Sequence, residues 1–549
     1  MRIDPHHPLS DLTGGSGCSD PLFSKIDMSK ICTANEAVSL IRSGQSVACA
    51  GVIGWLTPDH LLKALGQRFD ETSEPRDLTF YFPVSTGDAL GIRGMDHVAK
   101  EGLMKRVVSG NFINTLDPAT GKRPEMMRLI RDDLVEAYCW PIGATMHWLR
   151  EVARHSPGYF TKVGLGCYID PRQQGGKYTP RAQDELVQVI ELDGEEYLYY
   201  PTWPLDVGII RATSADEHGN LSFEDEPLLS SALALALAVK ASGGTVIAQV
   251  RKIVPRSSRP VHSVRIPGDL VDRVVVATEQ MMTTGIRYDD AFLGGQLFDG
   301  EPRVRMPLDA DKIIARRAAA EIRPGVVTIF GFGASSDIPG VMTERGDFRD
   351  NGLQRYNFTT EHGPFGGLVM GGWEFSANRY PEALIDGPSQ FDFIDGGNCS
   401  TAALAFAEFD RAGNVNVSRF GSANPGPGGF IDIAHNAREL IFTGTFTTGG
   451  LQIRVVDGKL EIVQEGRVRK FVESVREITY PLGANLLRRG QKARICTERA
   501  VFLVEPDGLV LTEIAPGIDL QTQVLDLMNF QPVRIAEPLL QMDPSLFME

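Results

Sequence analysis

An imperfect internal repeat is the feature of this sequence that most restricts its fold. Residues 41–44 (IRSG) precede an apolar stretch and a group of glycines, and Pro58 follows fourteen residues after Gly44. Residues 322–325 (IRPG) are followed by the same series, and Pro339 again lies fourteen residues after the motif's glycine. A single motif of this kind is common in turns. A second, independent match is therefore needed before its recurrence indicates a repeated domain.

The second match lies downstream in each half. Residues 216–222 (DEHGNLS) and residues 410–416 (DRAGNVN) share the pattern Asp-x-x-Gly-Asn, then an apolar and a polar residue, typical of a turn that leads into a strand. Because both motifs occur in the same order twice, the sequence predicts two related domains, as does a length of 549 residues. The predicted division is an N-terminal extension over residues 1–30, a first domain over 31–300 and a second over 301–549, with the boundary in the turn-rich stretch 294–311.

Strand-like and helix-like runs alternate along the chain. Residues 46–51 (SVACAG) are typical of a short buried strand, and residues 58–65 (PDHLLKAL) of a helix with proline in its first turn. Residues 233–242 predict another helix before a strand at 244–250, and residues 312–322 predict the first helix of the second half. This alternation predicts an α/β fold with mainly parallel sheets flanked by helices.

Charge and composition narrow the classes of partner. The formal net charge of −15 and the lack of a basic stretch argue against a nucleic-acid partner. No apolar run reaches the roughly 18 residues of a membrane helix, and the first twenty residues lack the apolar core of a signal peptide. Seven scattered cysteines without a CxxC pair predict reduced thiols in a cytoplasmic protein, and neither a disulfide framework nor a metal site.

Several familiar catalytic motifs are missing. The sequence contains no HExxH zinc motif, no P-loop and no GxSxG nucleophile elbow. Residues 331–333 (GFG) begin like a dinucleotide fingerprint, but Ser336 stands where the third glycine belongs. We therefore expect neither a metal nor a nucleotide redox cofactor.

One carboxylate stands out by its position. Glu361 follows a short β-prone run and precedes a glycine-rich bend within residues 358–367 (FTTEHGPFGG). Bends of this kind present side chains to the cleft beyond the strand ends of an α/β fold. From spacing alone, however, a solvated glutamate at a turn is the more economical interpretation.

Two further glycine-rich stretches lie downstream. Residues 420–430 (FGSANPGPGGF) precede a predicted helix at 431–440, so their amides either bind an anion or form a plain flexible loop. Residues 392–397 (DFIDGG) read as a third turn of this type, with aspartates that act as caps.

Many ordered segments resemble family I CoA-transferases, most of all the long single-chain propionate or short-chain-acyl type. The first-half segments are 93–106 (RGMDHVAKEGLMKR), 161–176 (TKVGLGCYIDPRQQGG), 193–199 (DGEEYLY) and 206–222 (DVGIIRATSADEHGNLS). The second-half segments are 359–367 (TTEHGPFGG), 383–397 (ALIDGPSQFDFIDGG), 413–421 (GNVNVSRFG), 428–437 (GGFIDIAHNA), 443–450 (TGTFTTGG) and 511–526 (LTEIAPGIDLQTQVLD).

The resemblance implies two related CoA-transferase-like α/β domains and places the nucleophile at Glu361, in the family's E-x-G context. Gly363 then supplies the tight turn. Candidates for an oxyanion or CoA contact are Gly363, Gly397, Gly428 and Gly429. The implied reaction moves CoA from a short-chain acyl-CoA to a carboxylic acid by a ping-pong mechanism through a glutamyl-CoA thioester. Coenzyme A is then a substrate, no metal or prosthetic group is needed, and a homo-oligomer is expected.

Two departures from the family pattern bear on specificity. His362 stands where relatives usually carry a smaller or uncharged residue, and residues 109–112 (SGNF) replace a Gly-Gly-His-Trp-like segment. A neighbour in an extended run usually points the other way, so we expect His362 to face away from Glu361. Two alternatives stay open at this point: an acyl-CoA thioester hydrolase on the same fold, and a non-catalytic acyl-CoA-binding protein.

Overall fold

The computed structural model describes residues 30–302 and 304–549, and its first half is built on one parallel sheet. All seven pairings between its eight strands are parallel. The short strands β2 and β9 are buried along their whole length, as expected of a sheet that helices cover on both faces. In spatial order the strands are β1 (Ile31–Cys32), β15 (Arg273–Val276), β12 (Thr245–Val250), β9 (Val207–Arg211), β2 (Ser46–Cys49), β3 (Leu78–Phe82), β4 (Met104–Ser109) and β5 (Glu136–Cys139).

The second half is built on a ten-stranded mixed sheet. Its five central strands are parallel, and antiparallel strands extend it on both sides. The predicted α/β class is thereby confirmed. In spatial order the strands are β21 (Ala383–Leu384), β18 (Pro364–Phe365), β17 (Asn357–Thr359), β16 (Val327–Phe330), β22 (Thr401–Ala405), β25 (Glu439–Thr443), β32 (Lys492–Cys496), β33 (Ala500–Glu505), β34 (Gly508–Ile514) and β35 (Arg534–Gln541).

The internal repeat corresponds to repeated structure. The order β15-β12-β9-β2-β3 in the first sheet matches the order β32-β25-β22-β16-β17 in the second, with β2 and β16 each following an IRxG motif. The DxxGN motifs form the same turn in both halves. Asp216 accepts a hydrogen bond from the Asn220 amide nitrogen at 3.0 Å, and Asp410 accepts one from the Asn414 amide nitrogen at 2.9 Å. The boundary at residue 300 itself stays a prediction.

Several helices lie close to their predicted positions. α2 (Asp59–Thr72) follows Pro58, α5 (Ala232–Ala241) precedes β12, and α6 (Ala310–Ala319) opens the second half behind the N-cap Asp309. The side chain of Asp309 accepts a hydrogen bond from the Lys312 amide, which satisfies one of the free donors of the first turn. Helix-forming composition, together with the proline before α2, therefore located these elements to within a few residues.

Two local predictions were wrong. Residues 392–395 are not a turn but the last part of α8 (Gly387–Asp395), whose N-cap is Asp386. The predicted helix at 431–440 is α9 (Phe430–Asn436), and it ends early because β25 starts at Glu439. In both cases the neighbouring element decides where the segment begins or ends, and a local pattern does not contain that information.

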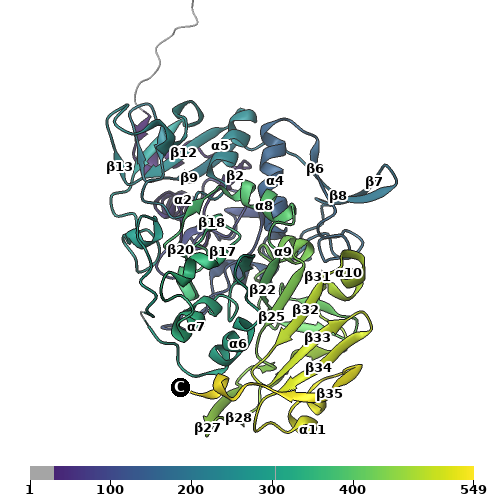
Figure 1. Cartoon of the computed structure of the whole chain (residues 1–549). Helices are drawn as coiled ribbons and strands as arrows, with labels where there is room; N and C mark the ends of the chain where they lie inside the picture. Colours follow the sequence, from purple (N-terminus) through teal and green to yellow (C-terminus); the bar gives the residue numbers. More distant parts are fainter. Residues whose placement is uncertain (1–29, 303) are drawn as a thin grey trace, which may run out of the picture.

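A continuous apolar core joins the two halves. It includes Trp148 on α4 (Ile142–Ala153) from the first half, together with Phe391 on α8 and Phe430 on α9 from the second. Figure 1 shows the two sheets side by side, with the three-stranded sheet of β6 (Gly158–Thr161), β7 (Gln188–Leu192) and β8 (Glu195–Pro201) projecting to one side. The remaining helices are α1 (Ala34–Val38), α3 (Glu125–Arg131), α7 (Ile338–Arg345), α10 (Leu482–Arg489) and α11 (Leu520–Gln523).

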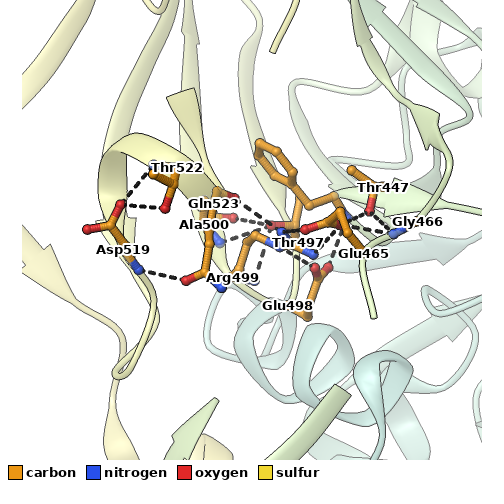
Figure 2. A network of polar contacts seen from close by, with 11 residues as sticks. Thr447, Glu465, Gly466, Thr497, Glu498, Arg499, Ala500, Asp519, Thr522 and Gln523 are labelled. Carbon is orange, nitrogen blue, oxygen red and sulfur yellow. Dashed lines mark hydrogen bonds and ion pairs between the residues drawn. The ribbon is translucent and has the colours of Figure 1, made fainter. Parts of the chain in front are cut away.

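A buried polar network lies beyond the carboxyl end of β32 (Figure 2). The Arg499 guanidinium donates to Glu498 and to Glu465, each at 2.7 Å, and to the carbonyl oxygen of Gln523 at 3.1 Å. Glu465 also accepts a hydrogen bond from Thr447. These contacts satisfy a fully buried guanidinium, as the energetics of a buried charge require, and they join segments that are distant in the sequence.

The predictions about cysteines, the N-terminal extension and membrane helices concern the whole chain, of which the structure describes a part. Six cysteines are free thiols, and the seventh, Cys18, lies outside the described residues together with the predicted extension, of which only residue 30 is described. Across residues 30–302 and 304–549, no helix is both long and apolar enough to span a bilayer.

Candidate active site

Glu361 lies in the turn that follows β17, at the carboxyl edge of the central parallel strands. The chain before it is fixed by the Thr359 hydroxyl, which donates to the Pro364 carbonyl oxygen at 2.7 Å. The side-chain amide of Gln390 on α8 donates to the Thr360 carbonyl oxygen, also at 2.7 Å. The backbone around Glu361 is therefore held on two sides, while its side chain remains 13% exposed.

Gly363 makes the turn possible. Its φ of +101° lies in a region that residues with side chains rarely adopt, and an added Cβ would overlap the Ile385 carbonyl oxygen. The Ile385 amide donates to the Gly363 carbonyl oxygen at 3.0 Å, which ties the turn to the strand beside it. The tight turn expected at Gly363 is thus present.

The glycine pair before α9 lies against the carboxylate of Glu361. A Cβ placed on Gly429 would lie 2.6 Å from Glu361 Oε2, and one placed on Gly428 would lie 3.5 Å from Oε1. Within the described part of the chain, neither of their amide nitrogens donates a hydrogen bond to another backbone or side-chain group. The backbone of both glycines therefore lies beside Glu361, and unengaged backbone amides are groups that can stabilise a developing oxyanion.

His362 approaches Glu361 instead of facing away. Its Nε2 lies 3.4 Å from Glu361 Oε1, and its side chain is 2% exposed. The expectation of opposite directions was wrong because β17 ends at Thr359, so Glu361 and His362 belong to a turn and not to an extended strand. The imidazole Nδ1 is buried and has no hydrogen-bond partner among the described residues.

The first half contributes directly to this site. The Ile142 amide at the start of α4 donates to the Gly428 carbonyl oxygen at 3.1 Å, and the Gly143 amide donates to Asp432 Oδ2 at 3.2 Å. The Phe112 amide, from the SGNF segment, donates to the Pro425 carbonyl oxygen at 2.6 Å. Two contacts between the halves therefore hold the glycine-rich loop, and a third holds the helix α9 that follows it.

Asp432 and its partners were missed by sequence reasoning. Asp432 lies in the first turn of α9 and is 1% exposed. Burial raises the pKa of its carboxyl well above the ordinary value, and the negative charges of Asp395 and Glu361 raise it further. The only available signal was its place two residues after Gly-Gly-Phe, which does not distinguish it from a solvated aspartate.

Gly397 is the one candidate that the structure does not bring to the carboxylate. It follows α8, and an added Cβ would meet no atom within 4 Å, so it faces open space. Among the described residues, no group of three or more His, Cys, Asp or Glu side chains is arranged to hold a metal ion.

The arrangement brings together a partly exposed carboxylate, two free amides and a neighbouring imidazole. A carboxylate of this kind can act as a nucleophile toward an acyl carbonyl, and the amides can stabilise the tetrahedral oxyanion that results.

Comparison with known proteins decides the family. Residues 31–277 match the family described as Coenzyme A transferase. The chain is 40% identical to acetate CoA-transferase YdiF of Escherichia coli (strain K12), over 94% of this chain and 95% of the relative. The chain belongs to the coenzyme A transferase family. It is accordingly an enzyme that transfers coenzyme A.

Two further comparisons agree with this assignment. The CoA-transferase is 38% identical to caffeate CoA-transferase of Acetobacterium woodii, over 95% of this chain and 98% of the relative. Its fold superposes on the crystal structure of the acyl-CoA transferase YdiF of E. coli O157:H7, a thioester complex with CoA, with a TM-score of 0.85. That structure is 39% identical, and the match covers 94% of this chain and 96% of the other.

Proposed function

We propose that this CoA-transferase moves CoA from a short-chain acyl-CoA to a carboxylic acid, with Glu361 as the covalent nucleophile. The observation that carries the proposal is the position of the Glu361 carboxylate against the backbone of Gly428 and Gly429, whose amides have no partner among the described residues. No lysine or arginine among the described residues lies within ion-pair distance of Glu361. Its oxygens are therefore available for attack.

With Glu361 as the nucleophile, one catalytic cycle runs through the following steps. A Glu361 oxygen attacks the thioester carbon, the C–S bond breaks, and an acyl-glutamyl anhydride and CoA thiolate form. The thiolate then attacks the glutamyl carbonyl, which releases the donor acid and leaves a glutamyl-CoA thioester. The acceptor carboxylate runs both steps in reverse. The solved YdiF complex contains a thioester with CoA, which supports an intermediate of this class.

Backbone amides beside Glu361 and the low exposure of its side chain contribute to the reaction in different ways. Every attack passes through a tetrahedral oxyanion, for which amide donors are worth about 3 kcal/mol each. The anhydride is sensitive to water, and the low exposure of Glu361, 13%, limits access of solvent to it.

The identity of the two acids is a separate question. Two relatives that match over at least 95% of their own length are named for acetate and for caffeate, a small aliphatic and a larger aromatic acid. A panel of acceptors should therefore include straight-chain, hydroxy, keto and aromatic acids. We expect short straight-chain acids to be exchanged fastest.

Trapping of the intermediate tests the proposal. Incubation with acetyl-CoA and borohydride should reduce the glutamyl thioester and shift the mass of the peptide that contains Glu361. Glu361→Ala should abolish exchange and labelling while CoA binding survives. Glu361→Asp should be severely impaired as well, because a side chain shorter by one methylene misplaces the attacking oxygen.

The matched control is Glu382→Gln, which removes an exposed carboxylate from the residue just before β21, beyond the same turn. We expect this variant to retain exchange and labelling. A label on any residue other than Glu361 would refute the assignment. Release of free thiol without an added acid, at the rate of exchange, would favour the hydrolase alternative.

Assembly and cellular location are two further proposals. Half-length relatives are named as the alpha and beta subunits of an acetate CoA-transferase of E. coli, and each matches part of this chain. We expect a homo-oligomer, which sedimentation at several concentrations can measure, and a cytoplasmic location, which fractionation can measure.

A further inference from the structure

His362 lies beside the nucleophile, and the proposed reaction gives it no role. Its imidazole Nε2 is 3.4 Å from Glu361 Oε1, whereas the other carboxylate oxygen, Oε2, lies next to Gly429. The turn that carries both residues is fixed by the Thr359 hydroxyl, which donates to the Pro364 carbonyl oxygen. The imidazole therefore faces one particular oxygen of Glu361.

The surroundings of the ring decide which of its nitrogens holds the proton. Nδ1 is buried and has no hydrogen-bond partner among the described residues, so an N–H there would be an unsatisfied donor. A carboxylate only accepts hydrogen bonds, and a bare Nε2 would set its lone pair against those of Glu361 Oε1. Both conditions are met by the neutral imidazole with its proton on Nε2. His362 is therefore a hydrogen-bond donor directed at Oε1.

The two oxygens of Glu361 have different fates in the proposed cycle. The oxygen that attacks the acyl-CoA becomes the bridging oxygen of the anhydride and leaves with the donor acid. The other oxygen is retained on the glutamyl carbon, as the carbonyl oxygen of the thioester. This retained oxygen carries the negative charge whenever the glutamyl carbon is attacked, by CoA thiolate in the first half-reaction and by the acceptor carboxylate in the second.

We infer that His362 is a catalytic residue whose Nε2–H donates to the retained oxygen of Glu361, at the position of Oε1, in these two attacks on the glutamyl carbon. A hydrogen bond makes an oxygen a poorer nucleophile, so Oε2 is the oxygen that attacks. The separation of 3.4 Å exceeds that of a formed hydrogen bond, and a shift of about 0.5 Å closes it. Because the bond is strongest to the oxyanion, it lowers the barrier of both attacks. The inference rests on the proposed role of Glu361.

His362 acts alongside the backbone amides and does not replace them. Half of the tetrahedral intermediates in one cycle form at the acyl carbon and half at the glutamyl carbon. Among the described residues, the Glu361 carboxylate makes no ion pair other than its contact with His362. The amides of Gly428 and Gly429 are then left for the oxyanion at the acyl carbon. The proton stays on Nε2 throughout, and the tetrahedral glutamyl carbon collapses by expelling the donor acid or CoA thiolate.

The second half-reaction, measured by itself, tests the inference. Enzyme loaded with acetyl-CoA is separated from excess ligand by gel filtration, and intact mass measures the glutamyl-CoA thioester. The loaded enzyme is then mixed with acetate, and the loss of thioester with time gives the rate of a half-reaction that begins with attack on the glutamyl carbon. His362→Leu has no donor and should lower this rate about 10²–10³-fold, the loss typical of one oxyanion donor.

Further variants separate the donor from the volume of the side chain. His362→Gln places an amide N–H near the position of Nε2 and should retain most of the rate. His362→Asn, whose shorter side chain does not reach that position, should react as slowly as His362→Leu. The matched control is His435→Leu, the same change in the last turn of α9, and it should react as the wild type does.

A spectroscopic measurement distinguishes hydrogen bonding from packing. With 13C in the glutamate carboxyl carbons, infrared difference spectra of loaded and free enzyme report the C=O stretch of the glutamyl thioester. A hydrogen bond lowers this frequency, so the wild type and His362→Gln should absorb below His362→Leu and His362→Asn. The wild-type frequency should also lie below that of a glutamyl thioester compound in an aprotic solvent, a comparison that needs no variant.

The outcomes separate the two proposals. If no glutamyl thioester forms in the wild type, the proposed function fails and the role of His362 fails with it. If the thioester forms and His362→Leu reacts with acetate at the wild-type rate, only the inference about His362 is overturned. A wild-type C=O stretch equal to that of the compound in aprotic solvent would overturn it too, even if every variant at position 362 failed to fold.

Discussion

At the scale of single residues, the site depends on how closely a backbone can approach a carboxylate. Gly429 has a φ of −84°, which any residue can adopt, so its backbone does not require glycine. The space beside Gly429 does require glycine, because an added Cβ would lie 2.6 Å from Glu361 Oε2. Sterics and backbone strain can therefore be tested separately at this position.

Gly429→Ala should displace the Glu361 carboxylate and block the amide beside it. We expect kcat to fall roughly 10²–10³-fold, the loss typical of one oxyanion donor, with a small change in the free energy of unfolding. Steady-state exchange kinetics and thermal unfolding measure the two effects.

Gly340→Ala is the control for a glycine-to-alanine change. Gly340 is an exposed position in α7, where an added Cβ would meet only Met306 Sδ at 3.8 Å. We expect unchanged kcat and a gain of about 0.5–1 kcal/mol in the free energy of unfolding. Equal loss of activity in both variants would contradict a specific role for Gly429.

At the scale of elements, the start of α4 connects the first half to the site. Two consecutive amides of this helix bond to the loop and to α9, at Gly428 and at Asp432. An added Cβ on Gly143 would lie 2.6 Å from Asp432 Cγ and 2.9 Å from Phe391 Cδ1. The two helices can thus approach this closely only with glycine at position 143.

Gly143→Ala should separate α4 from α9 and so move the glycine pair relative to Glu361. We expect a loss of about 1–3 kcal/mol in the free energy of unfolding, typical of overpacking, together with reduced kcat. Denaturant unfolding and exchange kinetics measure the change.

Ala153→Gly, in the last turn of the same helix, is the control. It should cost about 0.5–1 kcal/mol through helix propensity and leave kcat unchanged. If Gly143→Ala lowers stability without lowering kcat, the connection between α4 and the site is not needed for catalysis.

At the scale of the whole molecule, a buried carboxyl makes stability depend on pH. The side chain of Glu477 is 0% exposed and lies 3.7 Å from Arg419 Nη1. Its charge is felt by Tyr168 and Tyr178 of the first half, next to the bond from the Tyr168 amide to the Ile478 carbonyl oxygen. Glu477 therefore lies where the two halves meet.

Burial raises the pKa of Glu477 from 4.5 to about 7, partly offset by the charge of Arg419. The folded state then binds this proton more tightly than the unfolded state does. Its contribution to stability is complete below about pH 4.5 and is lost as pH rises through about 7. Relative to Glu477→Gln, the wild type should lose up to roughly 3 kcal/mol between pH 5 and 8.

Denaturant midpoints at pH 5, 6, 7 and 8 measure this difference. The control is Glu473→Gln, an exposed position on the same segment, 60% of whose side chain is accessible. Its difference from the wild type should not vary with pH. A constant difference for Glu477→Gln as well would show that Glu477 is ionised in both states.

The local sequence determined those features whose cause is local. Apolar runs, helix-forming composition and the repeated IRxG and DxxGN motifs predicted the α/β class, α5 and α6, and two related halves. The resemblance to CoA-transferases gave the family, and it singled out Glu361 and the glycines around it, which spacing alone treated as an ordinary turn.

Only the tertiary structure decided which of these residues meet. It brought Gly428 and Gly429 to Glu361 but left Gly397 facing open space, and it turned His362 toward Glu361. It also placed Asp432 behind the site, bonded to Gly143, which is 289 residues away along the chain. The physical reason is range: helix and turn signals act over a few residues, whereas burial and charge at the site depend on contacts between the two halves.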